Sequence, residues 1–191
     1  LTLDDYIDLV IPRGGENLIR FISNFSRIPV IKHYKGVCHV YIDEFADMQK
    51  GIEIAVNSKV QRPGVCNSME TLLIHQKLAS KILPDLFKIL ESYKVKVHTN
   101  NKIKEIVDNK NIIEVAEDDW HKEYLDLEMN IKIVSNIDEA INHIEKYGSL
   151  HTESIVTDDK KSAEYFINSV NSSAIMHNAS TRFNFIIRMN F

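Results

Sequence analysis

The sequence has little of what marks an unusual class of protein. Six glycines and four prolines among 191 residues are too few for a collagen-like or low-complexity chain, and two cysteines are too few for a disulfide-dense fold. Lys and Arg number 23 against 27 Asp and Glu, a balance that argues against a general nucleic-acid binder, which needs clustered cations. No apolar run reaches the roughly 18–20 residues that span a bilayer. We therefore expect no nucleic-acid partner and no membrane segment.

An export signal is also missing from the sequence. The chain starts at Leu1, and no basic stretch leads into its first apolar residues as in a secretory signal. The two cysteines, Cys38 and Cys66, are therefore expected to be reduced thiols in the cytoplasm rather than a disulfide. The length suggests one domain, or one and a fraction, with enough apolar surface for a core.

Short β-branched apolar runs alternate with amphipathic stretches along the chain. Strands are predicted at residues 7–11, 29–32, 37–42, 71–75, 95–99, 131–135, 154–157 and 174–178. Helices are predicted at residues 48–60, 77–93, 137–147 and 162–170, and another is expected to begin after residues 13–15. This alternation predicts an α/β fold with a mostly parallel sheet flanked by helices.

The helix ends carry three specific expectations. Asn136 and Glu139 have the spacing of an N-cap and a capping box. Gly148 follows the same helix where a residue tolerant of left-handed geometry is favoured. Pro84 is expected in the first turn of its helix, where its missing N–H group costs nothing.

Residues 61–67, QRPGVCN, hold the strongest chemical signal. Pro63 and Gly64 impose a turn, which predicts that Cys66 lies on a loop between a helix and a strand. A thiol in such a place is a candidate nucleophile, and Arg62 beside it could hold an anionic leaving group. The alternative is that Cys66 is a small buried hydrophobic residue, as free cysteines commonly are. Cys38, inside an apolar strand, is predicted to belong to the core.

Other polar segments give weaker signals. His33, Cys38 and His39 lack the paired spacing of zinc sites, so we expect no metal. Residues 13–15 (RGG) are interpreted as a tight strand-to-helix turn, with a phosphate-binding loop as the alternative. Residues 178–183 form a cation-bearing turn after a predicted strand, and α/β sheets present ligands beyond the carboxyl ends of strands.

Several segments together carry a family resemblance. In chain order they are IPRGG (11–15), PVIKH (29–33), QRPGVCN (61–67), EYLDL (123–127), HTE (151–153) and NASTRF (178–183). With them, the chain from about residue 5 to residue 183 resembles the γ-glutamyl phosphate reductase family of the aldehyde dehydrogenase superfamily. QRPGVCN and NASTRF are the most specific of the six.

The resemblance implies the NADPH-dependent reduction of L-glutamyl 5-phosphate to L-glutamate 5-semialdehyde with release of phosphate, a cytoplasmic step of proline biosynthesis. Cys66 would attack the acyl phosphate and carry the acyl group as a thioester. Glu123 matches the glutamate that holds the nicotinamide-side ribose of the cofactor. The residues that the resemblance places at the substrate are Arg62, Asn67, Ser180, Thr181 and Arg182.

Family chains are roughly twice this length, so the resemblance implies truncation at both ends. Residues 1–33 would be a remnant of the Rossmann-like cofactor-binding domain, and residues 34–178 an aldehyde-dehydrogenase-like catalytic domain. Residues 179–191 would be a substrate-site turn followed by an unrelated apolar tail. We expect this chain alone to have little or no reductase activity, and the parent family to be homo-oligomeric.

Three alternatives remain open from the sequence. The chain is a non-catalytic folded module that pairs with another chain, or another acylating aldehyde dehydrogenase with a different acyl substrate. The third alternative is a cysteine hydrolase or transferase in which Cys66 works with His33 or His75.

Overall fold

The computed structural model describes residues 1–32, 34–107 and 112–183. His33 and the expected tail at 184–191 therefore lie outside the described residues. The chain forms two compact units, Leu1–Lys35 and Gly36–Phe191. In the described ranges, no helix is both long and apolar enough to cross a membrane.

The first unit contains the helix α1 (Glu16–Phe25), as expected after residues 13–15. The two strands predicted there are wrong, because residues 7–11 and 29–32 meet only at a single parallel bridge between Val10 and Val30. Two paired segments are marginal in water without a further strand or an apolar face to bury. That this unit is a remnant of a cofactor-binding domain stays a prediction.

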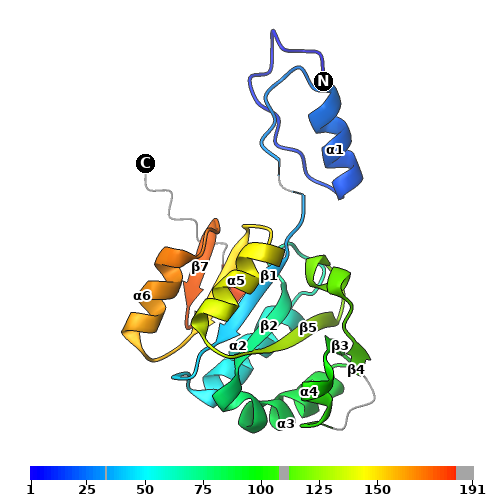
Figure 1. The fold of residues 1–191 in the computed structure, drawn as a ribbon. Coiled ribbons are helices and arrows are strands. Elements are labelled where there is room, and N and C mark those ends of the chain that lie inside the picture. The colour runs from blue at the N-terminus through cyan, green and yellow to red at the C-terminus, as the bar shows by residue number, and fades with distance from the viewer. Residues whose placement is uncertain (33, 108–111, 184–191) are drawn as a thin grey trace. The chain divides into compact units, whose positions relative to one another are not determined.

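The second unit is built on a seven-stranded parallel sheet, and this confirms the predicted fold class (Figure 1). Its strands run in the order β4-β3-β5-β2-β1-β6-β7. Their bounds are β1 Cys38–Ile42, β2 Met69–His75, β3 Lys96–Thr99, β4 Ile112–Glu114, β5 Glu128–Val134, β6 Thr152–Val156 and β7 Ala174–His177. Sequence patterning missed β4, since three residues are too few to show a period.

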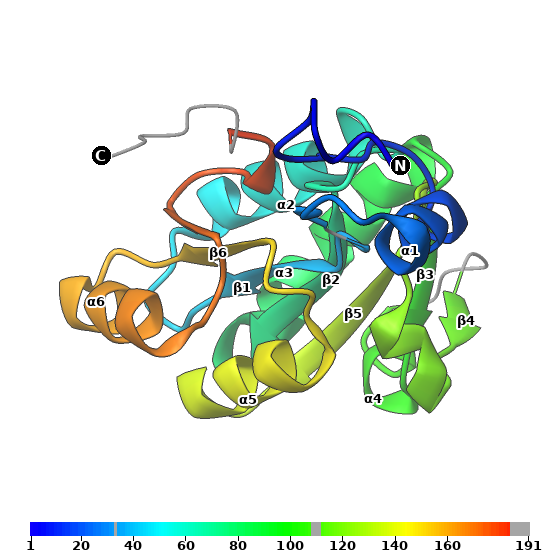
Figure 2. The same ribbon diagram turned by 90° about the horizontal axis from the view of Figure 1, so that it is seen from above.

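Helices cover both faces of this sheet (Figures 1 and 2). The bounds are α2 Met48–Val60, α3 Gln76–Ser92, α4 Asn101–Lys104, α5 Ile137–Tyr147 and α6 Lys160–Ser169, with 3-10 turns η1 Glu117–His121 and η2 Thr181–Phe183. Along β1, Val40 and Ile42 pack in one core with α2 and α3, whereas Tyr41 packs in a second core with α5 and α6. Successive strand residues face opposite sides, which explains why β1 is buried throughout.

The N-terminus of α5 follows the prediction in part. Asn136 caps the helix, because its Oδ1 accepts the Glu139 N–H at 2.9 Å. The Glu139 carboxylate turns instead to the backbone N–H of Ser135, at 2.8 Å, so the reciprocal bond falls one residue earlier than a capping box.

At the C-terminus of α5, the expectation of left-handed geometry is wrong, because Gly148 has a φ of −68°. The glycine is needed for space, since a Cβ there would lie 2.5 Å from the Ile144 carbonyl oxygen.

Pro84 lies in the interior of α3, so its predicted place in the first turn is wrong. The helix begins earlier than the proline suggests, directly after His75, whose ring accepts the Lys77 N–H at 3.3 Å. Leu83 and Leu86 on either side of Pro84 are completely buried. Burial of this apolar face maintains the helix despite the missing backbone donor.

Candidate active site

Cys66 is exposed on the loop between α2 and β2. The loop closes with a hydrogen bond of 2.9 Å from the Ser68 N–H to the Val65 carbonyl oxygen. This confirms the predicted loop position and excludes the alternative of a buried hydrophobic cysteine. The neighbouring Asn67 is buried, and its contact with substrate stays a prediction.

Cys38 is the buried thiol of the two, as predicted, and neither cysteine forms a disulfide. Burial, and then the nearby carboxylate of Glu153, raise the pKa of the Cys38 thiol well above its usual range, which keeps it protonated and unreactive. Its Sγ donates to the Cys66 carbonyl oxygen over 3.3 Å. Cys38 therefore supports the loop, and Cys66 is the thiol available to a reactant.

Gly36 joins Cys66 to Glu123. Its backbone N–H donates to Glu123 Oε1 at 2.8 Å, across 87 positions of the chain. A Cβ at this position would lie 1.8 Å from the Cys66 carbonyl oxygen and 2.6 Å from its Cα, so only glycine fits. The backbone of Gly36 thus touches the Cys66 loop on one side and the Glu123 carboxylate on the other.

The segment 123–127 lies against the same loop. A Cβ at Gly64 would meet the Leu125 carbonyl oxygen at 3.5 Å, an ordinary contact. Leu125 has a φ of +55°, a left-handed conformation that costs a non-glycine residue about 1–2 kcal/mol. Tyr124 anchors the segment because its hydroxyl donates to Asn130 Oδ1 at 2.9 Å. Strain of this kind is common where a segment is held for a functional purpose.

The polar turn at 178–183 reverses the chain after β7. Asn178 has a φ of +52°, which asparagine tolerates better than most residues. Its side chain bonds both backbone groups of Thr157, at 3.1 Å to the N–H and 2.9 Å to the carbonyl oxygen. The Ser154 hydroxyl then donates to the Ala179 carbonyl at 2.7 Å, and the chain runs back along the sheet.

Arg182 completes the cluster around the thiol. Its Nε donates to Gln61 Oε1 at 2.8 Å, which ties the NASTRF turn to the QRPGVCN loop. Burial, followed by repulsion from Arg62, lowers the pKa of Arg182, and the Cys66 thiol acts in the opposite direction. Arg182 Nη1 is buried and has no hydrogen-bond partner among the described residues. Two guanidinium groups beside an exposed thiol, one with an unused donor, are suited to an anionic ligand.

Ser180 and Thr181 are buried under Arg182. The Ser58 hydroxyl on α2 donates to Ser180 Oγ at 3.0 Å and accepts the Thr181 N–H at 3.3 Å. Ser180 Oγ also accepts the Arg182 N–H at 3.2 Å. In this conformation the two residues anchor the turn that carries Arg182, and direct contact with substrate stays a prediction.

The cluster lies at the amino ends of the parallel strands. Gly36 precedes β1, Cys66 precedes β2 and Glu123 precedes β5. The expectation that the NASTRF turn presents its groups beyond a carboxyl end is wrong for Arg182. Because the chain doubles back after Asn178, Arg182 meets Gln61 at the C-terminal end of α2.

His75 and Cys66 lie at opposite ends of β2. His75 ends this strand, whose seven residues span roughly 20 Å at about 3.3 Å per residue. The alternative of a Cys66–His75 catalytic pair is therefore wrong, and the pairing with His33 lies outside the described residues. Within those residues, no group of three His, Cys, Asp or Glu side chains is placed to hold a metal ion.

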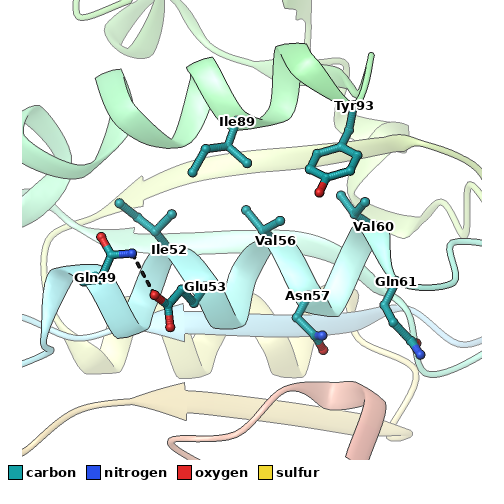
Figure 3. A pocket seen from close by; sticks show the side chains of 9 residues that line it. All are labelled: Gln49, Ile52, Glu53, Val56, Asn57, Val60, Gln61, Ile89 and Tyr93. Atoms are coloured by element: carbon teal, nitrogen blue, oxygen red, sulfur yellow. Dashed lines mark hydrogen bonds between the residues drawn. The ribbon is translucent and has the colours of Figure 1, made fainter.

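A groove of about 380 Å³ lies between α2 and α3, and Cys66 is not among the residues that line it (Figure 3). Its residues are Gln49, Ile52, Glu53, Val56, Asn57, Val60, Gln61, Ile89 and Tyr93. Gln61 is the link to the cluster, since it lines the groove and also accepts from Arg182. The thiol site and the groove are thus distinct places that share one side chain.

Reasoning from the sequence missed Gly36, Ser58 and Gln61 as parts of the cluster. Gly36 had one usable signal, its place directly before a fully buried strand, where glycine often marks close backbone approach. Gln61 had its place in the QRPGVCN motif, but nothing there indicated its bond to Arg182, and Ser58 had no signal, because both partners are more than 120 positions away.

Comparisons with known proteins identify relatives of this chain. The gamma-glutamyl phosphate reductase of Thermodesulfovibrio yellowstonii is 52% identical over 184 residues, which are 96% of this chain and 44% of that protein. The enzyme of the same name from Geotalea daltonii is 48% identical over 183 residues, again 96% of this chain and 43% of the relative. No family model matches the chain.

Solved structures agree with these relatives. The gamma-glutamyl phosphate reductase of Thermotoga maritima has a TM-score of 0.90 and 44% identity, over 95% of this chain and 44% of that one. An acetylating aldehyde dehydrogenase from Geobacillus thermoglucosidasius, at 22% identity, has a TM-score of 0.71 over 92% of this chain and 47% of that one, which shows a shared fold. The chain spans less than half the length of the curated relatives it matches. By sequence and by fold, it is a homologue of part of gamma-glutamyl phosphate reductase, with an aldehyde-dehydrogenase-like structure.

Proposed function

We propose that this chain carries the thiol site of an enzyme that reduces L-glutamyl 5-phosphate to L-glutamate 5-semialdehyde, with NADPH as reductant and phosphate as the second product. The observation that supports the proposal best is that Arg182 is hydrogen-bonded to Gln61 on the loop that carries Arg62 and the exposed Cys66, in a chain about half identical to gamma-glutamyl phosphate reductases. This reaction would serve proline biosynthesis in the cytoplasm, in a homo-oligomeric enzyme.

The first step would use residues of this chain. The Cys66 thiolate attacks the acyl carbon, the bond from that carbon to the phosphate oxygen breaks, and phosphate leaves as the thioester forms. Arg62 is exposed on the same loop as Cys66 and would stabilise the leaving phosphate. Arg182 Nη1, buried without a partner among the described residues, would bind the α-carboxylate of the glutamyl group. A thiolate suits both steps because it attacks well and later departs well.

Glu123 would hold the cofactor. Gly36 occupies Oε1 of this half-buried carboxylate, which leaves Oε2 to accept from a ribose hydroxyl. The bond from Gly36 also keeps the carboxylate next to the Cys66 loop, so a molecule bound to Oε2 lies near the thiol. A bound nicotinamide cofactor would supply the hydride that reduces the thioester. When the resulting thiohemiacetal collapses, Cys66 is released as the thiolate together with the aldehyde.

The test has two parts on the folded chain. First, acetyl phosphate serves as a simple acyl phosphate, and mass spectrometry measures an acyl adduct on Cys66 that hydroxylamine removes. Second, glutamate 5-semialdehyde, NADP⁺ and phosphate are supplied together, and formation of NADPH is followed.

We expect the adduct in the wild type and in Cys38→Ser, and its loss in Cys66→Ser. No adduct on a folded wild-type chain would reject Cys66 as the acyl carrier. Adduct formation without NADPH would show that the cofactor needs more than the residues present here.

A further inference from the structure

A buried ion pair closes the base of the Cys66 loop. Lys59 Nζ and Glu70 Oε2 are 2.9 Å apart, and both side chains are completely shielded from solvent. Lys59 is the last residue but one of α2, and Glu70 is the second residue of β2. The pair therefore joins the two ends of the segment that carries Cys66. A second tie runs beside it, from Ser68 Oγ to the Ser58 carbonyl oxygen at 3.4 Å.

Stability alone does not explain a buried ion pair. Removing two charges from water costs as much as their attraction returns, and apolar residues of similar volume often stabilise a fold equally well or better. Another lysine of α2 shows the ordinary arrangement, since Lys50 pairs with Asp158 at 3.2 Å with both side chains exposed. Lys59 and Glu70 thus occupy places where the fold could have used two apolar side chains.

The surroundings of the pair connect it to the rest of the thiol site. The charged and titratable groups that face Lys59 and Glu70 are Cys38, Glu123, Tyr124, Asp126 and Glu128. They come from β1, from the segment that carries Glu123 and from the start of β5. The carboxylates that act on the Lys59 ammonium are those of Glu70, Asp126 and Glu128, from β2, the 123–127 segment and the start of β5. Glu70 Oε1 is buried without a hydrogen-bond partner in the described part of the chain.

We propose that Lys59 and Glu70 are positioning residues for Cys66. Their charged pair holds the loop in the conformation that exposes the thiol beside Glu123, and protonation of Glu70 releases the hold. The inference rests on the proposed function only in taking Cys66 as the reacting thiol.

The electrostatics of the pair support this role. Burial raises the pKa of Glu70 to about 7, against the opposing attraction of Lys59. Burial also lowers the pKa of Lys59, with Glu70 acting in the opposite direction. Below neutral pH, therefore, the carboxyl group becomes uncharged and the ammonium loses its counter-charge. Above neutral pH the Glu70 carboxyl group is ionised, and its attraction to Lys59 holds the loop.

The experiment measures the alkylation of Cys66 by iodoacetamide from about pH 6 to pH 9, a range that includes the titration of Glu70. The label on the Cys66 peptide is counted by mass spectrometry, and circular dichroism checks the fold. Glu70→Gln keeps the shape of the side chain and removes its charge. Lys50→Met is the control, because it removes an exposed ion pair from the same helix.

We expect the wild-type rate to show an inflection near pH 7, where Glu70 titrates. Its size should be about twofold or more, the lower bound for groups coupled in one ion-pair network. Glu70→Gln should lose this inflection and Lys50→Met should keep it. A folded Glu70→Gln chain that retains the wild-type profile would overturn the proposal.

A double variant guards against loss of folding. Lys59→Met combined with Glu70→Leu leaves no unpaired charge and should fold. Its Cys66 should alkylate at a changed rate with no inflection near pH 7. A wild-type rate and profile in this variant would make the pair purely structural. Alkylation requires neither NADPH nor an acyl phosphate. The alkylation result can therefore be interpreted even if the proposed reaction fails.

Discussion

Replacing Gly36 by alanine is the sharpest test of how the site is assembled. The new Cβ would lie 1.8 Å from the Cys66 carbonyl oxygen, whereas ordinary contact begins at 3.4 Å, so that oxygen must retreat by about 1.6 Å. The obstacle is backbone and cannot turn aside as a flexible side chain does. Any share of the shift that Gly36 itself takes displaces its N–H from Glu123 Oε1, now 2.8 Å away.

The expected loss of stability is about 3 kcal/mol, the upper part of the range for overpacking a close-packed site. For a chain of this size that corresponds to a melting temperature lower by about 6–12 °C. Urea unfolding followed by circular dichroism measures the first quantity, and calorimetry the second. Because the Cys66 backbone must move, the rate at which iodoacetamide alkylates Cys66 should change as well.

Gly64→Ala is the matched control for Gly36→Ala. It makes the same chemical change on the Cys66 loop itself, but its Cβ would meet only the Leu125 carbonyl oxygen, at an ordinary 3.5 Å. We expect stability within about 0.5 kcal/mol of the wild type and an unchanged alkylation rate. If Gly36→Ala proved as harmless as Gly64→Ala, the packing of Gly36 on Cys66 described above would be refuted.

Three further outcomes are expected. Burial lowers the pKa of His143 to about 2, so the unfolded chain takes up this proton first and His143 lowers the stability by about 1.4 kcal/mol per pH unit below pH 6.5. Glu70, whose pKa is raised to about 7 in the folded chain, acts in the opposite direction. In urea titrations at several pH values, His143→Phe should therefore gain about 1.4 kcal/mol relative to the wild type for each pH unit below pH 6.5, and a difference that does not change with pH would contradict the assignment. Ser58→Ala should lower the free energy of unfolding by about 1–3 kcal/mol, because Ser180 Oγ and the Thr181 N–H lose their buried partner. An unchanged free energy of unfolding would mean that other contacts hold the turn at 178–183. Pro84→Ala should raise the melting temperature by restoring a backbone donor inside α3, and a lower melting temperature would show that the proline ring itself packs usefully.

Local chemistry allowed part of the site to be predicted. Pro63 and Gly64 impose a turn wherever they occur, so the loop position of Cys66 could be inferred without a structure, and the structure confirms it. Helix α2 was predicted with its observed bounds because its apolar spacing is periodic. In contrast, the predicted position of Pro84 and the predicted conformation of Gly148 were wrong. Tertiary packing decided where α3 begins, and the close approach of Gly148 to the Ile144 carbonyl decided the need for glycine after α5.

The sequence by itself determined an α/β fold with a thiol on a loop, because the alternation of apolar runs, the turn residues and the motif are local properties of a chain. Only the tertiary structure decided what surrounds that thiol. The sheet order places β2 between β1 and β5. This brings Gly36, Cys66 and Glu123 together at the amino ends of these strands, although the three residues are far apart in sequence. The reversal after Asn178 adds Arg182. Such contacts depend on which strands pair and where the chain turns back, and no local pattern encodes either.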